Sequence, residues 1–197
     1  MKILGISAKS KNGKDTIANY LIEKGFQRVA FADPLKTTLS VLVNEPLEHF
    51  HTQEGKEMVN QMTKIKNRIL LQAFGEVMRN DFPEAVKRIA DPSTDMSFFD
   101  DHMFWVNTCL SVLKSKPDAK YVISDVRYPN EVEAIKAQGG VVIRHFRRDW
   151  IPDPELEKHH SETALDGYTG FDRIATTASI EQMYRWIDWV LEHYALT

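Results

Sequence analysis

The sequence is short of several features that would point to particular protein classes. It contains one cysteine, Cys109, which excludes an intrachain disulfide and favours a reducing compartment. No apolar run approaches the roughly 18 residues of a membrane span, and the N-terminus reads as a strand, not a signal peptide. The 25 basic residues do not outnumber the 28 acidic ones, and a net charge of −3 favours neither nucleic acid nor an anionic membrane as partner. We therefore expect a cytoplasmic protein in which any phosphate binding is local.

The composition is typical of a folded domain. Of the 197 residues, 43% are hydrophobic and 27% are charged, close to globular averages. This length suits one α/β domain with insertions better than two domains. We expect a single domain over residues 1–197, with polar insertions at about 44–102 and a lid-like loop at about 147–166.

Strand-like and helix-like segments alternate along the chain. Short apolar runs predict five buried strands, at residues 2–7, 28–32, 121–125, 141–146 and 171–176. Helical periodicity predicts intervening helices at 14–24, 35–43, 64–79 and 104–114, with two more after the capping pairs Asn130/Glu133 and Ser179/Gln182. Asp33 is explained as a helix N-cap before Pro34. The alternation predicts a parallel sheet covered by helices on both faces, with ligands at the carboxyl ends of its strands.

The loop after the first strand carries the strongest chemical signal. Residues 8–16 read AKSKNGKDT, close to the phosphate-binding pattern G-x-x-x-x-G-K-[ST]. Ala8 replaces the first glycine, and Asp15 stands where Ser or Thr usually binds magnesium. A strand before the loop and a helix after it favour a phosphate site over a lysine-rich surface turn, because backbone N–H groups at a helix start can surround phosphates.

Asp15 has two interpretations that the sequence leaves open. A carboxylate beside phosphates would be repelled unless a cation lay between them, so Asp15 could bind magnesium directly or through water. It could instead stabilise the first turn of the following helix, leaving the phosphate to Thr16.

Further charged residues are candidates for a phosphotransfer site. Lys36 lies one turn inside the helix after the second strand, and Arg68 lies on the polar side of a later helix. Asp125 ends a buried strand and resembles a carboxylate that orients magnesium-bound water, and Arg127 follows two residues later. Each alone is typical of a solvated surface, but their location after parallel strands favours a shared site.

A series of motifs resembles one known family along nearly the whole chain. They are GKDT (13–16), FADPLK (31–36), LLQAFGE (70–76), FW (104–105), ISDVRYPNE (123–131), GGVVIRHFRR (139–148) and HHSETALD (159–166). Together they resemble the bacteriophage deoxynucleoside monophosphate kinases. The resemblance implies a three-layer P-loop NTPase fold with strand order 2-3-1-4-5, and transfer of the γ-phosphoryl group of ATP to a deoxynucleoside 5′-monophosphate, giving dNDP and ADP, with Mg²⁺ as cofactor.

The resemblance also assigns residues by matching motif. ATP would be bound by Lys11, Asn12, Gly13, Lys14, Asp15, Thr16 and Arg147, with the metal at Asp15, Thr16 and Asp125. The acceptor would be bound by Lys36, Arg68, Gln72, Arg127, Glu131 and Glu162. Lys14, Arg68, Asp125 and Arg127 would be catalytic. His159 matches a motif of unassigned role, and Thr177-Ala178 replaces the Asn-Asp that the family often has near the fifth strand, which leaves the adenine contacts open.

Two other functions stay open at this point. A dephospho-coenzyme A kinase would be expected to carry a plain GK[ST] loop, and a nucleotide-sensing module would bind without turnover. We expect small-molecule nucleotides as partners, no nucleic acid and no membrane, with a homodimer as one allowed assembly and the host cytoplasm as location if the chain is phage-encoded.

Overall fold

The computed structural model describes residues 1–152, 154 and 160–197. The chain divides into two compact units: Met1–Ala30 together with Val112–Thr197, and Phe31–Ser111. We call them the sheet unit and the helical unit. His159 and part of the predicted lid-like loop lie outside the described residues.

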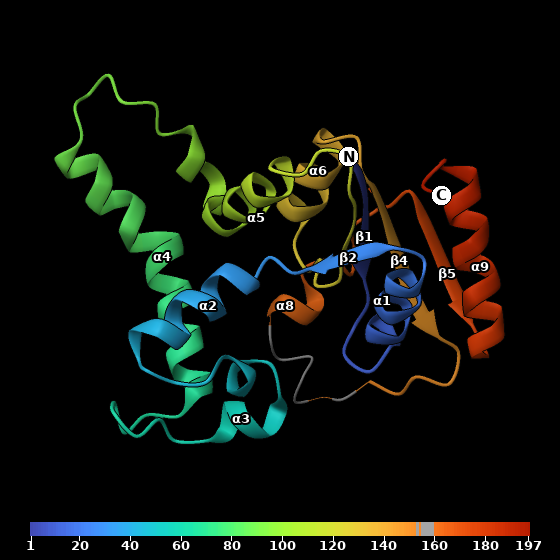
Figure 1. Cartoon of the computed structure of the whole chain (residues 1–197), viewed down its shortest axis with the longest axis horizontal. Helices are drawn as coiled ribbons and strands as arrows, with labels where there is room; N and C mark the ends of the chain where they lie inside the picture. Colours follow the sequence, from blue (N-terminus) through green and yellow to red (C-terminus); the bar gives the residue numbers. More distant parts are fainter. Residues whose placement is uncertain (153, 155–159) are drawn as a thin grey trace. The chain divides into compact units, whose positions relative to one another are not determined.

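The sheet unit contains five parallel strands in the order β2-β3-β1-β4-β5. The strands are β1 (Lys2–Ser7), β2 (Phe26–Val29), β3 (Lys120–Ile123), β4 (Val141–Arg147) and β5 (Arg173–Thr177) (Figure 1). This confirms the predicted fold class and strand order. β1 is the central strand, with β3 on one side of it and β4 on the other. The loop that follows β1 therefore lies at the point where an open parallel sheet binds its ligands.

Helices pack on both faces of this sheet. Leu4 and Ile6 of β1 join a buried cluster with α1 (Lys14–Glu23) and α9 (Ile180–His193). Gly5 points to the opposite face, where α6 (Pro129–Ala137) approaches so closely that a Cβ on Gly5 would lie 2.8 Å from Ile135 Cδ1. Glycine at the centre of β1 therefore lets α6 pack closely, and a larger residue there would force the Ile135 side chain to move.

Several predicted boundaries need correction. β2 begins and ends earlier than residues 28–32, and Asp33 is the first residue of α2 (Asp33–Leu42), so it is not the N-cap. The cap of α6 is Tyr128, whose N–H donates to Glu131, and not Asn130 with Glu133. Ser179 does cap α9 as predicted, accepting from Gln182 N at 3.2 Å.

The helical unit contains the segments predicted as insertions. Its elements are α2, η1 (Leu47–Phe50), α3 (Gln53–Glu57), α4 (Asn67–Ile89), η2 (Ser97–His102) and most of α5 (Phe104–Lys114). The predicted helix 64–79 is wrong at its C-terminal end, because α4 continues through Pro83. Phe82 packs edge-on against Phe99 and Phe104 around this point. Tertiary packing thus offsets the hydrogen bond that proline removes.

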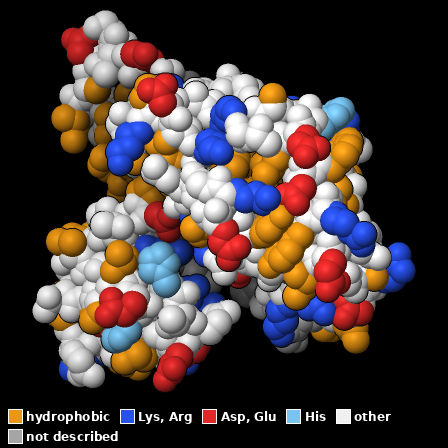
Figure 2. Space-filling view, turned by 45° about the vertical axis from the view of Figure 1, so that its right-hand side comes forward, with side chains coloured by type: hydrophobic (Ala, Val, Ile, Leu, Met, Phe, Trp, Pro, Cys, Tyr) orange, Lys and Arg blue, Asp and Glu red, His pale blue; other side chains and the backbone are white. Residues whose placement is uncertain are grey.

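The surface carries charges of both signs. On the face shown in Figure 2, Lys and Arg side chains are interspersed with Asp and Glu. Among the described residues, no helix combines the length and apolarity needed to cross a membrane.

Candidate active site

The loop between β1 and α1, residues 8–13, carries the motif that predicts phosphate binding, and we call it the phosphate loop. Lys11 and Gly13 adopt left-handed conformations with φ of 62° and 82°, and Gly13 is the N-cap of α1. Glycine tolerates this conformation at no steric cost. The turn leaves the first N–H groups of a ten-residue helix available to an anion. The replacement of the first glycine by Ala8 does not prevent the strand–loop–helix arrangement.

A buried relay of hydrogen bonds fixes this loop to β4 and β5. The Asn12 carbonyl lies 2.8 Å from His145 Nδ1, and Asn12 Oδ1 accepts from Arg147 N at 2.8 Å. Since a carbonyl only accepts, Nδ1 of His145 carries the proton, and Nε2 accepts from the Thr177 hydroxyl at 2.9 Å. Burial lowers the pKa of His145, so the ring is neutral. Asn12 thus shapes the loop, while its buried Nδ2 has no partner among the described residues.

Asp15 lies between two cations at the start of α1. Its Oδ2 is 3.1 Å from Lys14 Nζ, and its Oδ1 is 2.9 Å from Arg28 Nη2. Partial burial raises the pKa of Asp15, but the charges and hydrogen bonds of Lys14 and Arg28 outweigh it and lower the pKa overall. The carboxylate therefore stays ionised and 60% exposed, which suits both a magnesium ligand and a stabiliser of the helix N-terminus.

A pocket of about 250 Å³ opens beside the phosphate loop. It is lined by Gly13, Thr16, His145, Arg147, Asp149, Thr177, Ala178, Ser179, Ile180 and Met183. Arg147 forms an ion pair with Asp149, with Nη2 to Oδ2 at 2.6 Å. The lining thus includes the β5–α9 connection, the apolar residues Ile180 and Met183, and the cation Arg147.

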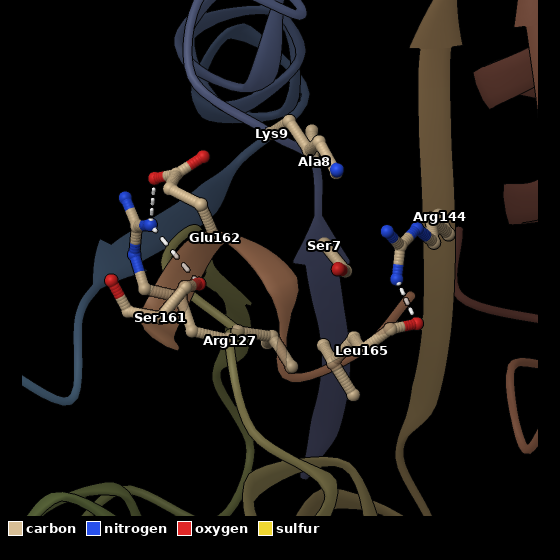
Figure 3. A pocket seen from close by; sticks show the side chains of 9 residues that line it. Ser7, Ala8, Lys9, Arg127, Arg144, Ser161, Glu162 and Leu165 are labelled. Carbon is tan, nitrogen blue, oxygen red and sulfur yellow. Dashed lines mark hydrogen bonds and ion pairs between the residues drawn. The ribbon is translucent and has the colours of Figure 1, made fainter. Parts of the chain in front are cut away.

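On the other side of the loop, Arg127 lies beside α8 (His160–Thr163) (Figure 3). Arg127 Nη1 forms an ion pair with Glu162 Oε1 and lies 3.5 Å from the Ser161 carbonyl. The other oxygen of Glu162 accepts from Ser10 N of the phosphate loop at 2.8 Å. One carboxylate therefore joins a cation that follows β3 to the loop that follows β1.

A second acidic residue reinforces this attachment. Asp166 accepts from Lys9 Nζ and from Arg144 Nη2, each at 2.8 Å. Arg144 is nearly buried in β4 and also donates to the Leu165 carbonyl. Buried cations require such partners, so the segment 160–166 is fastened to both β4 and the phosphate loop.

Glu131 lies inside the protein, behind the turn that carries Arg127. Its Oε2 accepts from Arg127 N at 2.6 Å and from Tyr128 N at 3.0 Å. Burial first, and then the charge of Asp125, raise the pKa of Glu131 to about 8. Glu131 thus holds the backbone of the β3–α6 turn, and its contact with an acceptor stays a prediction.

The remaining acceptor candidates belong to the helical unit. Lys36 Nζ lies 3.8 Å from the Asp33 carboxylate and 3.5 Å from His51 Nδ1. Arg68 donates from Nε to Glu57 Oε1 at 2.5 Å and from Nη2 to Gln53 Oε1 at 3.0 Å. Gln72 is exposed one turn further along α4, on the same face as Arg68. Both cations therefore contact the short segment 51–57.

The metal candidates do not form a cage of protein ligands. Within residues 1–152, 154 and 160–197, no three or more His, Cys, Asp or Glu side chains gather as a metal site. Magnesium usually keeps several waters and binds through one or two carboxylates plus substrate phosphates. Asp15 and Thr16 at the phosphate loop fit that mode.

Some residues of the site were not anticipated from the sequence. His145, Arg144 and Asp166 connect the loop to its surroundings, and Arg28 pairs with Asp15. A signal was present for two of them: Arg144 and His145 interrupt an otherwise apolar strand, and charged or polar residues at buried positions need specific partners.

Comparison with known proteins adds the following. No family model matches the chain. The chain is 31% identical, over 191 residues and 93% of both proteins, to an Acanthamoeba polyphaga mimivirus protein provisionally named a deoxynucleotide monophosphate kinase. It is 25% identical, over 90% of its length, to the uncharacterized protein ORF77 of Ictalurid herpesvirus 1 (strain Auburn), of which it covers 64%.

Two solved structures resemble the chain at low sequence identity. One is a dephospho-CoA kinase from Campylobacter jejuni, 16% identical with a TM-score of 0.48, covering 99% of this chain and 98% of that chain. The other is TT1252 from Thermus thermophilus, 16% identical with a TM-score of 0.49, covering 97% and 96% respectively.

Proposed function

Because this chain belongs to the deoxynucleotide monophosphate kinase family, we propose that it transfers the γ-phosphoryl group of ATP to a deoxynucleoside 5′-monophosphate, giving dNDP and ADP. One observation carries the proposal beyond family membership. The phosphate loop and Arg127 follow different parallel strands, yet both contact Glu162. The phosphate loop, proposed to bind ATP, and Arg127, proposed to bind the acceptor phosphate, are therefore neighbours in the sheet unit.

The donor would bind on the phosphate-loop side. Lys11, Gly13, Lys14 and Thr16 are proposed to hold the ATP phosphates, with Asn12 shaping the loop from inside. The pocket of about 250 Å³ is proposed to take the base, because it begins at Gly13 and Thr16 and ends at the β5–α9 connection. Arg147 at its edge could leave Asp149 for a phosphate, since an exposed ion pair contributes only about 0–1 kcal/mol.

Asp15, Thr16 and Asp125 are proposed to hold magnesium, which would supply charge neutralisation of the phosphates when bound. The ionised Asp15 carboxylate supports this assignment. Lys14 would add a further cation at the transferred group. Phosphoryl transfer asks for positioning and charge stabilisation more than for covalent chemistry, so these residue types are sufficient.

Arg127 of the sheet unit is proposed to bind the acceptor monophosphate. Lys36, Arg68 and Gln72 of the helical unit stay predicted acceptor contacts on the strength of the family resemblance. Arginine can bind a phosphate through two parallel N–H bonds, which lysine cannot imitate. Support comes from the arrangement of Arg127, whose backbone is held by Glu131 and whose Nη1 is held by Glu162.

A coupled assay for ADP tests the proposal. ATP and Mg²⁺ are offered with each of the deoxynucleoside monophosphates, with the corresponding ribonucleotides and with dephospho-coenzyme A in parallel. We expect ADP formation that depends on a deoxynucleoside monophosphate and is absent in Lys14→Ala. Turnover with dephospho-coenzyme A alone would favour the other kinase, and nucleotide binding without turnover would favour a sensing module.

A further inference from the structure

Glu162 stands out because it touches two parts of the site at once. Its side chain is 9% exposed, one oxygen accepts from Ser10 N, and the other pairs with Arg127 Nη1 (Figure 3). The family resemblance predicts that Glu162 binds the acceptor, but its contacts favour a different role.

Glu162 accepts from two donors, Ser10 N–H and the Arg127 guanidinium, which differ in the hydrogen bonds they can still offer a substrate. Ser10 N–H carries a single hydrogen, so its bond to Glu162 fixes the loop and is not available to a phosphate at the same time. Arg127 has five N–H donors, and its Nε and Nη2 make no hydrogen bond with any described residue. Glu162 thus uses one end of the guanidinium and leaves the other two nitrogens for a bidentate phosphate contact.

The segment that carries Glu162 is itself anchored. Arg144, which is 6% exposed at the side chain, binds the Leu165 carbonyl and Asp166, and Asp166 also binds Lys9. From behind, Glu131 holds the backbone N–H of Arg127. Arg127 is therefore fixed at its backbone by Glu131 and at its Nη1 by Glu162, which leaves little freedom for its phosphate-facing edge.

We propose that Glu162 is a positioning residue for phosphoryl transfer, which sets the free edge of Arg127 against the phosphate loop and does not itself bind substrate. This inference rests on the proposed function, because it takes Arg127 as a ligand of the acceptor phosphate. In the alternative, the Glu162 carboxylate competes with the substrate phosphate for Arg127 and must be displaced when the substrate binds.

The test begins with Glu162→Gln, which keeps the side-chain shape and removes the charge. We expect kcat to fall and KM for the deoxynucleoside monophosphate to rise, with a loss in kcat/KM of about ten- to a hundredfold, at or below the range for removing a direct charge stabiliser. Affinity for a non-hydrolysable ATP analogue should change less than threefold. Glu84→Gln, which removes the same charge from the surface pair with Lys87, is the matched control and should behave as wild type.

A double-mutant cycle separates positioning from a general structural effect. If Glu162 acts mainly through Arg127, adding Glu162→Gln to Arg127→Ala should cause a much smaller loss in kcat/KM than it causes in wild type, because only its contact with Ser10 N is then left to weaken. Full additivity of the two losses would overturn the inference. A lower KM for the acceptor in Glu162→Gln would also overturn it, because that is the result for a carboxylate that competes with substrate.

Two further measurements do not depend on turnover. Calorimetry with the deoxynucleoside monophosphate alone should show weaker binding to Glu162→Gln than to wild type. If wild type binds this nucleotide but makes no ADP, the proposed function fails, and the binding comparison still tests the role of Glu162.

Trp150 Nε1 donates to the Ser10 carbonyl at 2.9 Å, so the fluorescence of Trp150 reports the conformation of the phosphate loop without any ligand. This signal is isolated by subtracting the spectrum of Trp150→Phe. An unchanged Trp150 spectrum in both Glu162→Gln and Glu162→Asp would overturn the claim that Glu162 holds the loop, and circular dichroism confirms that both variants are folded.

Discussion

Glu131 should make the stability of the chain fall as the pH rises from about 4.5 to about 8. The residue is 8% exposed. Burial and the neighbouring charge of Asp125 raise the pKa of its carboxyl from 4.5 to about 8, against the lowering effect of the Arg127 and Tyr128 N–H groups and of the Arg127 charge. The folded chain therefore keeps a proton that the unfolded chain begins to release near pH 4.5. Stability from this proton is fully present below that pH and is lost as the pH rises through about 8.

The size of the effect follows from the two pKa values. The gap between 4.5 and about 8 corresponds to roughly 5 kcal/mol, since one pH unit is worth about 1.36 kcal/mol. About 3 kcal/mol of this is already lost at pH 7. That is a large share of the roughly 5–15 kcal/mol by which domains are stable.

The assay is denaturant unfolding of wild type and Glu131→Gln at pH 5, 6, 7 and 8. Glutamine stays neutral, and its Oε1 can accept from the same two N–H groups, so the stability difference between the proteins should change by roughly 3 to 4 kcal/mol across this range, in favour of the variant at high pH. His145, whose pKa is lowered from 6.5 by burial, acts with the opposite sign but is present in both proteins. Glu133→Gln, an exposed change on the same helix, should follow wild type.

A stability difference that stays constant from pH 5 to 8 would refute the reasoning. It would mean that Glu131 is ionised throughout, and that two N–H bonds at the start of α6 outweigh the cost of burying its charge.

Four further outcomes are expected from the proposed site. Lys14→Ala should lower kcat by about a hundredfold or more while the circular dichroism spectrum is unchanged, because its charge acts in the transition state. If Asp15 helps to place magnesium, Asp15→Asn should raise the magnesium requirement, and Asp15→Ser should keep more activity than Asp15→Ala; equal behaviour of the three in a magnesium titration would assign Asp15 to the helix N-terminus. Arg127→Lys should raise KM for the deoxynucleoside monophosphate and lower kcat, a combined loss of roughly 2 to 4 kcal/mol, and calorimetry should find ATP-analogue binding nearly unchanged. Arg68→Lys should have the same pattern, and a collapse of ATP-analogue affinity with a normal acceptor dependence would place this arginine on the donor side instead.

The sheet could be predicted because its signals are local. Five short apolar runs separated by helical periods are a property of the sequence alone, and β1 and α5 were predicted to the residue. The strand order came from the resemblance to a family and not from these runs. The phosphate loop was recognisable despite two departures because the strand before it and the helix after it remained.

The errors arose where tertiary contacts decide local structure. The assignment of Glu131 to the acceptor stays a prediction, but nothing in the sequence indicated that this residue, three residues into α6, accepts the N–H of Tyr128. Pro83 was expected to lie in an irregular stretch after the helix, but an aromatic cluster across the helical unit keeps α4 intact. Nothing in the sequence around Arg28 indicates that it pairs with Asp15, thirteen residues earlier.

The sequence predicted cations for the candidate site but not their partners. Five of these cations pair with a carboxylate: Lys14 with Asp15, Lys36 with Asp33, Arg68 with Glu57, Arg127 with Glu162, and Arg147 with Asp149. Pairs exposed to water contribute only about 0–1 kcal/mol each, so a phosphate dianion can replace the carboxylate at little cost. Separating Arg127 from Glu162 costs more free energy, because Glu162 is largely buried and would be left as an uncompensated charge. The carboxylates of the other four pairs are 41–69% exposed and are suited to give way to nucleotides, whereas Glu162 is 9% exposed and is suited to hold Arg127 in place.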